Sequence, residues 1–263
     1  EHAFRSPPSA IDTSRFIHVG AARYKALLET PAPEWMVEGF MRPTVTTVMG
    51  GAPFTGKTWL GLQIATSIAA GIDVWPGAET RPTDGIVVWL SYDGHMSVEE
   101  IARRAAHLDR GAHRRGQDVK PGAWFDRFVT IGNSETSGPW PSSRYTFSEG
   151  GVDALCDEIL YPIQQERGPI AAVFVDTLSS SMPEGCDENS SSEMNGFMNR
   201  ATGIAFQFKA ALAMLHHPTK GATSSQKRGE ANHDDWTSYF RGSSAVPAAA
   251  GAVAGMYQPK SDP

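Results

Sequence analysis

The amino-acid sequence predicts an α/β fold built on a mostly parallel sheet with helices on both of its faces. Short apolar segments of strand length alternate along the chain with longer segments of helical spacing. Several strand segments are apolar throughout, as in parallel sheets that are buried on both sides. A glycine-rich loop joins the first of these strands to the helix that follows it, which is also typical of α/β proteins.

Helices and strands are predicted in alternation from residue 14 onward. Gly71 should close the helix after the glycine-rich loop, because glycine readily adopts the left-handed conformation of a helix C-cap. Ser97 should begin the next helix as its N-cap, with Glu100 three residues on as its partner in a capping box. Helices are expected at 14–30, 56–71 (amphipathic), 97–108, 150–168 and 188–209. Strands are expected at 44–51, 85–94, 127–132, 170–180 and 210–217, with a last one within 241–258.

The chain of 263 residues is long enough for one large α/β domain. Residues 1–33 are expected to form an N-terminal arm with a helix, and residues 34–263 a single domain, since no internal repeat divides them. Because the chain begins with Glu1 rather than methionine, we expect a fragment or a trimmed chain.

Composition excludes several classes of protein. A hydrophobic content of 40% with 20% charged residues indicates a soluble globular protein rather than a disordered one. No segment has the length and apolar content of a membrane span, so we expect no membrane contact. Cys156 and Cys186 lack metal-ligand spacing and form no evident disulfide framework, so we expect a cytoplasmic protein. The net charge of −6 excludes coating of DNA by bulk positive charge, so any nucleic-acid contact must be local.

Residues 51–58 read GAPFTGKT and fit the phosphate-binding pattern G-x-x-x-x-G-K-[ST] between a strand and a helix. Backbone N–H groups of such a loop converge on phosphate oxygens, and the dipole of the following helix favours their negative charge. Lys57 is expected to reach the β- and γ-phosphates of ATP, and the Thr58 hydroxyl to ligate Mg²⁺. The residues predicted to bind the nucleotide are Gly51, Ala52, Pro53, Phe54, Thr55, Gly56, Lys57, Thr58 and Trp59.

Two aspartates, Asp93 and Asp176, follow predicted buried strands. Open parallel sheets bind ligands at the carboxyl ends of their strands, so both carboxylates should face the same crevice as the glycine-rich loop. Asp176 is predicted to serve the Mg²⁺ site, and Asp93 to polarise the attacking water as a general base. The alternatives are an ordinary turn or cap at Asp176, and a turn before Gly94 at Asp93.

Two adjacent histidines, His216 and His217, end another apolar strand. Neighbouring residues of a strand point to opposite sides, and no Cys or His lies at a zinc-like spacing, so a shared zinc site is disfavoured. One imidazole should face a helix layer while the other emerges at the crevice, where it can hydrogen-bond a γ-phosphate. A satisfied core histidine is a fair alternative for His216, and less so for His217.

The motif set resembles that of the RepA-like ATPases, RecA-fold proteins of plasmids and phages typified by a hexameric replicative helicase. The resemblance rests on the phosphate loop followed in order by VFVDTL, DENSSSEM, LHHPTKG and RGSSA, and it covers about residues 34 to 250. It implies a RecA-like P-loop NTPase fold, a homo-oligomeric ring such as a hexamer, and single-stranded DNA as a partner.

The resemblance also implies roles for individual residues. Lys57 and Thr58 would bind phosphate and Mg²⁺, with Asp176 on the metal side. His217 would sense the γ-phosphate, and Arg241 would be the arginine finger that reaches into a neighbouring subunit's site. The segments at about 178–192 and 218–240 would line the pore of the ring, where Lys220, Lys227 and Arg228 would contact nucleic acid. A surface ion pair is the alternative for Arg241.

This sequence departs from the family's pattern in two places. Family members usually carry glutamate where Asp93 aligns, and the shorter aspartate would hold the lytic water less well. The chain also ends soon after its last predicted strand, whereas members usually continue with further strands, so we expect a truncated segment or a reduced domain.

Three functions fit these observations. The leading hypothesis is a Mg²⁺-dependent ATPase that hydrolyses ATP at subunit interfaces and couples hydrolysis to binding or translocation of single-stranded DNA. The alternative is a slow nucleotide-dependent switch or assembly ATPase that recruits a replication or defence partner without unwinding. A small-molecule kinase ranks below both, because it has no use for the HHPTK and RGSS motifs.

Overall fold

The computed structural model describes residues 34–51, 54–75, 78–81, 83–114, 122, 124–216 and 245–256, together with Glu29. The chain divides into two compact units, Glu1–Glu34 and Trp35–Pro263. The second unit holds the sheet and all of the described helices and strands. The helix predicted at 14–30 lies outside the described residues except for Glu29.

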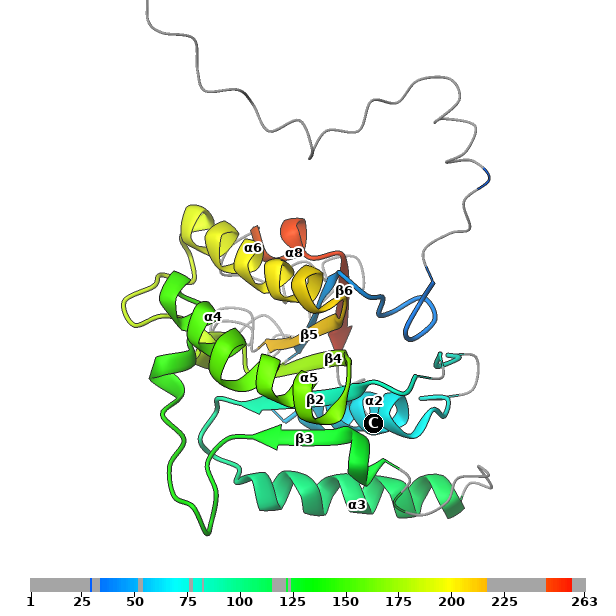
Figure 1. Cartoon of the computed structure of the whole chain (residues 1–263). Helices are drawn as coiled ribbons and strands as arrows, with labels where there is room; N and C mark the ends of the chain where they lie inside the picture. Colours follow the sequence, from blue (N-terminus) through cyan, green and yellow to red (C-terminus); the bar gives the residue numbers. More distant parts are fainter. Residues whose placement is uncertain are drawn as a thin grey trace, which may run out of the picture. The chain divides into compact units, whose positions relative to one another are not determined.

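Six parallel strands form the central sheet in the order β3-β2-β4-β5-β1-β6 (Figure 1). The strands are β1 Thr46–Gly51, β2 Ile86–Ser91, β3 Phe128–Ile131, β4 Ile170–Asp176, β5 Ala211–His216 and β6 Ala252–Met256. Each of the six falls within a segment predicted as strand, and every pairing between these six strands is parallel. The carboxyl ends of all six strands therefore lie along one edge of the sheet.

Helices cover both faces of this sheet, as predicted (Figure 1). On one face lie α2 Lys57–Ala70 and α3 Val98–Arg114, with the short turn η2 Phe125–Arg127 near them. On the other lie α4 Glu149–Leu155, the π-helical turn η4 Cys156–Leu160, α5 Tyr161–Arg167, α6 Ser191–Phe208 and α8 Ala245–Ala249. Two further short turns are η3 Ser142–Tyr145 and η5 Ser179–Ser181.

The core consists of two apolar layers because successive strand residues point to opposite faces. In β2, Val87 and Trp89 pack toward α2 and α3, while Val88 and Leu90 pack toward α4–α6. The Trp89 ring stacks on Phe174 of β4 with the ring centroids 5.5 Å apart. Burial on both sides explains why these strands are apolar throughout.

Helix α2 is not amphipathic, so that part of the prediction is wrong. Leu62, Ile64 and Ile68 are buried, and so are the polar Thr66 and Ser67. The sheet covers one side of the helix, and residues of α3 and of the segment before β1 join the same apolar layer. A helix enclosed in this way is buried around most of its circumference.

Both predicted helix caps exist, although one of them is incomplete. Gly71 ends α2 at φ 68° and donates its N–H to carbonyls of the last turn, as expected for a left-handed C-cap. The Ser97 hydroxyl accepts the Glu100 N–H at 3.1 Å. The Glu100 carboxylate, however, accepts from Arg103 and Arg104 instead of completing the predicted capping box.

Within the described residues, none of the helices combines the length and the apolar content that a membrane span requires. Cys156 is buried and Cys186 is half-buried, and both thiols are free.

Candidate active site

The phosphate loop lies where the sequence predicts, between the end of β1 at Gly51 and the start of α2 at Lys57. Gly51 is required by close contact, since a Cβ there would lie 2.9 Å from Thr55 Oγ1 and 3.0 Å from Met256 of β6. Gly56 is required by conformation, because it precedes the helix at φ 88°. The two glycines therefore shape the loop for different physical reasons.

Lys57 is buried in the first turn of α2, and its ammonium group folds back over the loop. Its Nζ donates a hydrogen bond to the Gly51 carbonyl oxygen at 2.7 Å. Burial lowers the pKa of Lys57 to about 8, and the nearby Asp176 carboxylate only partly opposes this shift. A phosphate placed on the loop would add the negative charge that this buried ammonium needs.

Thr58 and Asp176 meet across the site, as predicted for residues that share a metal ion. The Thr58 hydroxyl donates to Asp176 Oδ2 at 3.1 Å, and the carboxylate is buried at the end of β4. The pKa of Asp176 is raised to about 6: burial and the Asp93 charge raise it, and the Thr58 hydrogen bond and the Lys57 charge oppose them only in part. A hydroxyl and a carboxylate are the oxygen ligands that Mg²⁺ prefers, so this pair fits the expected ion.

Asp93 lies beside Asp176 because the ends of β2 and β4 are joined. The N–H groups of Tyr92 and Asp93 donate to the Asp176 carbonyl oxygen at 2.6 and 3.2 Å. The Asp93 carboxylate is one-third exposed and lies 3.5 Å from Nε2 of His95. One edge of the sheet thus carries Lys57, Thr58, Asp93 and Asp176 around the phosphate loop.

A known protein family matches this chain over most of its length. A family model described as the AAA domain matches residues 10–223, which is most of the chain. The chain belongs to the AAA domain family. It is a P-loop ATPase, as the sequence predicts.

Solved structures agree with the fold of this AAA domain. One of them, itself an ATPase domain, has a TM-score of 0.54 and 13% identity, over 90% of this chain and 81% of that chain. A DnaB-like replicative helicase, solved in a study of its interactions with primase, has the same score and identity over 90% of this chain and 55% of that chain. At this identity the likeness shows the fold alone, and it confirms the RecA-like P-loop architecture. No curated protein sequence matches the chain.

Arg104 of α3 is a residue of the AAA domain's site that the motifs did not indicate. Its guanidinium lies 5.2 Å from the centroid of the Trp59 ring, and its Nε donates to Glu100 Oε1 at 2.8 Å. Its positive charge lowers the pKa of Asp176, so the arginine lies within electrostatic reach of that carboxylate. In the sequence, the signal that could have pointed to Arg104 was its position on the predicted helix that follows Asp93.

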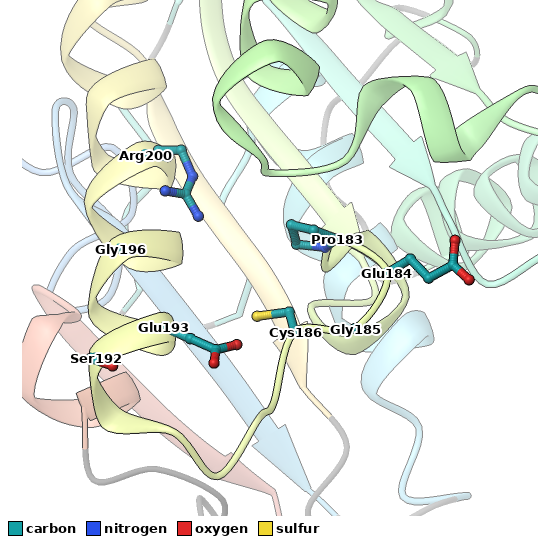
Figure 2. Close-up of a pocket in the computed structure, with 8 residues that line it drawn as sticks. All are labelled: Pro183, Glu184, Gly185, Cys186, Ser192, Glu193, Gly196 and Arg200. Carbon is teal, nitrogen blue, oxygen red and sulfur yellow. The ribbon is translucent and has the colours of Figure 1, made fainter.

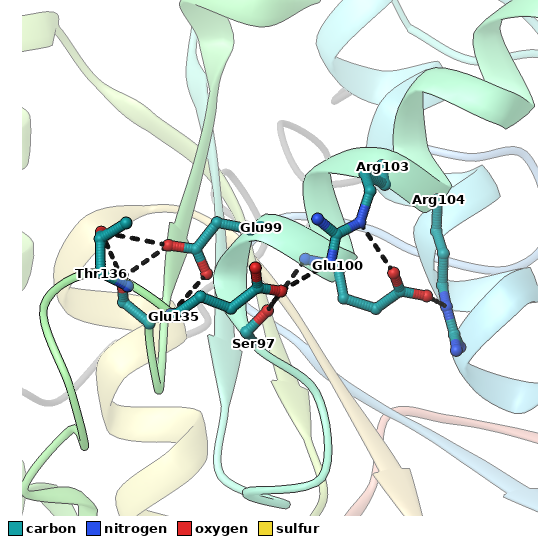
Figure 3. Close-up of polar contacts among 8 residues, drawn as sticks. Ser97, Glu99, Glu100, Arg103, Arg104, Glu135 and Thr136 are labelled. Carbon is teal, nitrogen blue, oxygen red and sulfur yellow. Dashed lines mark hydrogen bonds and ion pairs between the residues drawn. The ribbon is translucent and has the colours of Figure 1, made fainter.

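A polar cluster holds the start of α3, and with it Arg104, in place (Figure 3). Glu99 accepts hydrogen bonds from the Ser134 hydroxyl at 2.6 Å and from the Glu135 N–H at 3.0 Å. These bonds lower the pKa of Glu99 to about 2. Arg103 links Glu100 to Glu135, so α3 is attached to the 133–138 turn through two side chains.

Phe54 and Trp59, both predicted to bind nucleotide, expose their side chains near the loop. The Phe54 side chain is fully exposed, and its backbone adopts φ 64°, an uncommon conformation for a bulky residue. The Trp59 side chain is 41% exposed and lies against Arg104. Their side chains are thus turned outward, and any contact of these two residues with phosphate would come from the backbone.

The remaining predicted residues divide into two groups. His216 ends β5 in the core with 1% of its surface exposed, on the face that packs against α6, which confirms the expectation of a core histidine. Several predicted residues lie outside the described part of the chain: Ala52, Pro53, His217, Lys220, Lys227, Arg228 and Arg241. Their roles stay predictions.

Proposed function

We propose that this AAA domain is a Mg²⁺-dependent ATPase that works at the interfaces of a homo-oligomer and couples ATP hydrolysis to single-stranded DNA. The observation that carries the proposal is the meeting of Thr58 and Asp176, at 3.1 Å, beside the buried Lys57. Two oxygen ligands and an ammonium group in one crevice match the needs of a magnesium–triphosphate complex.

Each side chain has a defined task in this proposal. Lys57 binds the β- and γ-phosphates, and its pKa rises when they arrive because the phosphates supply opposite charge. Thr58 and Asp176 hold Mg²⁺, which neutralises charge on the phosphate oxygens. Asp93 accepts a hydrogen bond from the attacking water and orients it as a general base.

Residues outside the described part complete the proposed site. His217, which follows β5 directly in the sequence, hydrogen-bonds the γ-phosphate and reports its loss. Arg241 enters the site of a neighbouring copy and neutralises charge on the transferred phosphoryl group. Lys220, Lys227 and Arg228 contact the DNA backbone, which suits an acidic protein of the cytoplasm whose nucleic-acid contact must be local.

Steady-state hydrolysis with and without a single-stranded oligonucleotide tests the coupling and the arginine finger. We expect the oligonucleotide to stimulate hydrolysis, and Arg241→Ala to lower kcat by about a thousandfold, since fingers contribute at least that much. Arg167→Ala is the matched control, because Arg167 is exposed at the end of α5. Mixing Arg241→Ala with Lys57→Met should restore part of the activity, because mixed interfaces pair an intact loop with an intact finger. If the oligonucleotide stimulates ATP hydrolysis by Arg241→Ala as strongly as it does in the wild type, Arg241 is not an arginine finger.

A slow nucleotide-dependent switch is the second candidate, favoured by the short and partly exposed carboxylate of Asp93. The main proposal expects Asp93→Glu to change kcat by less than about threefold, because the Asp93 backbone is already fixed beside Asp176. A rise of about tenfold or more would instead identify Asp93 as a brake on turnover. Single-turnover measurements would separate hydrolysis from product release in either case.

A further inference from the structure

The end of β5 lies between the two parts of the candidate active site. In the sheet, His216 is paired with Gly50 of β1, immediately before the glycine whose carbonyl accepts the Lys57 hydrogen bond. On its other side Leu215 is paired with Asp176. A shift of the end of β5 would therefore move the phosphate loop relative to the metal carboxylate.

The side chain of His216 is not directed at the phosphate loop or the metal site. Strand alternation places it on the α6 face with Leu212 and Met214, opposite to the face on which Asp176 meets Thr58. There its Nε2 lies 3.4 Å from Glu188 Oε1. Glu188 belongs to the segment that joins η5 to α6, so the contact connects the end of β5 to that segment.

In this pair the imidazole is buried and the carboxyl is half-buried. His216 is 1% exposed and the Glu188 side chain 23% exposed. Burial raises the pKa of Glu188, although a hydrogen bond with Ser179 partly opposes the shift. Apolar side chains of similar volume often stabilise a fold at least as well as a buried polar pair. A gain in stability is therefore a weak explanation for this pair, and a fixed position for the end of β5 is the better one.

A backbone contact acts at the same place. The Leu178 N–H, just beyond β4, donates to the Leu215 carbonyl oxygen at 2.7 Å. The end of β5 is thus held by the main chain on the β4 side and by Glu188 on the α6 side. Gly50 and Asp176 meet β5 within one residue of these two contacts.

We propose that Glu188 is a positioning residue of the ATPase reaction, which acts through His216 to fix the end of β5 beside the phosphate loop. The inference rests on the proposed function. Glu188 is not one of the residues proposed to bind phosphate or metal; it sets the distance between the phosphate loop and Asp176. Loss of this contact should therefore slow the chemical step more than it weakens nucleotide binding.

The test compares Glu188→Ala and Glu188→Gln with Glu184→Ala in the full chain. Glu184 is the matched control, because it is exposed in the same segment and its carboxylate points away from α6; the residue itself lines a pocket of about 410 Å³ (Figure 2). The measurements are kcat and KM for Mg²⁺-ATP, the dissociation constant of a fluorescent ADP analogue and the melting temperature.

Glu188→Ala should lower kcat about ten- to a hundredfold, since a misplacement of about 1 Å can cost about a hundredfold, while KM and the ADP dissociation constant stay within about twofold. Glu188→Gln should recover most of the kcat, because an amide of the same length can keep the polar contact with the imidazole. Glu184→Ala should match the wild type. Should Glu188→Ala not fold, Glu188→Asp replaces it: it keeps the charge but shortens the reach, and the same fall in kcat is expected.

Two results would overturn the inference. One is that folded Glu188→Ala or Glu188→Asp hydrolyses bound nucleotide as fast as the wild type does. The other is a parallel loss of nucleotide affinity and melting temperature, which would mean that Glu188 only stabilises the fold. A wild-type chain that neither binds nor hydrolyses ATP would remove the proposed function as well, so the two failures are distinguishable.

Discussion

Replacing Lys57 by methionine is expected to abolish ATP hydrolysis and at the same time to stabilise the fold. The ammonium group is the positive charge that the loop offers to the phosphates, so kcat/KM should fall by at least about a hundredfold. In the protein without nucleotide, however, burial lowers the pKa of Lys57 from 10.5 to about 8, which corresponds to roughly 3 kcal/mol of destabilisation at neutral pH. Loss of the bond to Gly51 offsets about 1 kcal/mol of this, which leaves a net gain of about 2 kcal/mol.

The pH dependence of unfolding separates this explanation from ordinary repacking. Below about pH 8 the folded and unfolded chains both carry a charged lysine, so the wild type bears the full cost. Between pH 8 and 10.5 the unfolded chain binds more protons than the folded one, and wild-type stability should rise relative to Lys57→Met. Urea unfolding at about pH 7 and about pH 9.5, on either side of the folded-state pKa, measures the difference. Lys209→Met, at an exposed lysine that ends α6, is the control. A difference in unfolding free energy between the wild type and Lys57→Met that stays the same at both pH values would contradict the prediction.

Asp176→Asn is expected to raise the Mg²⁺ concentration that activity requires and to lower kcat/KM by about a hundred- to a thousandfold. The amide can still accept the Thr58 hydrogen bond, so the fold should survive while the metal loses its charged ligand. Titration of activity with Mg²⁺ at fixed ATP measures the effect. Asp153→Asn, at an exposed aspartate of α4, should behave as the wild type.

Asp176 should also make both stability and metal binding depend on pH. Burial raises its pKa from 3.8 to about 6, so between these values the folded chain binds more protons than the unfolded one. Wild-type stability should therefore fall as pH rises from 3.8 to 6, by roughly 3 kcal/mol, and Asp176→Asn should lack this slope. Below about pH 6 the protonated carboxyl should bind Mg²⁺ less well. An unchanged stability slope in Asp176→Asn would show that another group is responsible.

The parts of the site that could be predicted follow from local pattern and topology. Lys57 and Thr58 come from a motif whose spacing is set by the loop itself, and Asp176 from the rule that parallel strands end at one edge. Arg104 and Glu188 could not be predicted in this way. Their roles depend on how α3 and the segment before α6 pack, and no local spacing in the chain encodes that packing.

The same distinction applies to the fold. The central strands β2, β4 and β5 were predictable because their apolar runs match a doubly covered sheet, whereas the order of the strands depends on long-range pairing. The helix predicted at 150–168 contains a π-helical turn, and its cause lies in the local sequence rather than in the spacing of apolar residues. Pro162 has no N–H to continue the helical bonding and crowds the carbonyl one turn earlier, and the chain forms the π-helical turn at 156–160 just before it.

The pairing of β1 has a consequence for how the protein acquires its activity. Both neighbours of this early strand, β5 and β6, are synthesised last among the described strands, so the phosphate loop lacks its flanking strands until the chain has emerged as far as Met256. Contacts between such distant segments form slowly, because a long stretch of chain must be ordered first. Nucleotide that binds only the completed sheet would then favour maturation over misfolding by mass action.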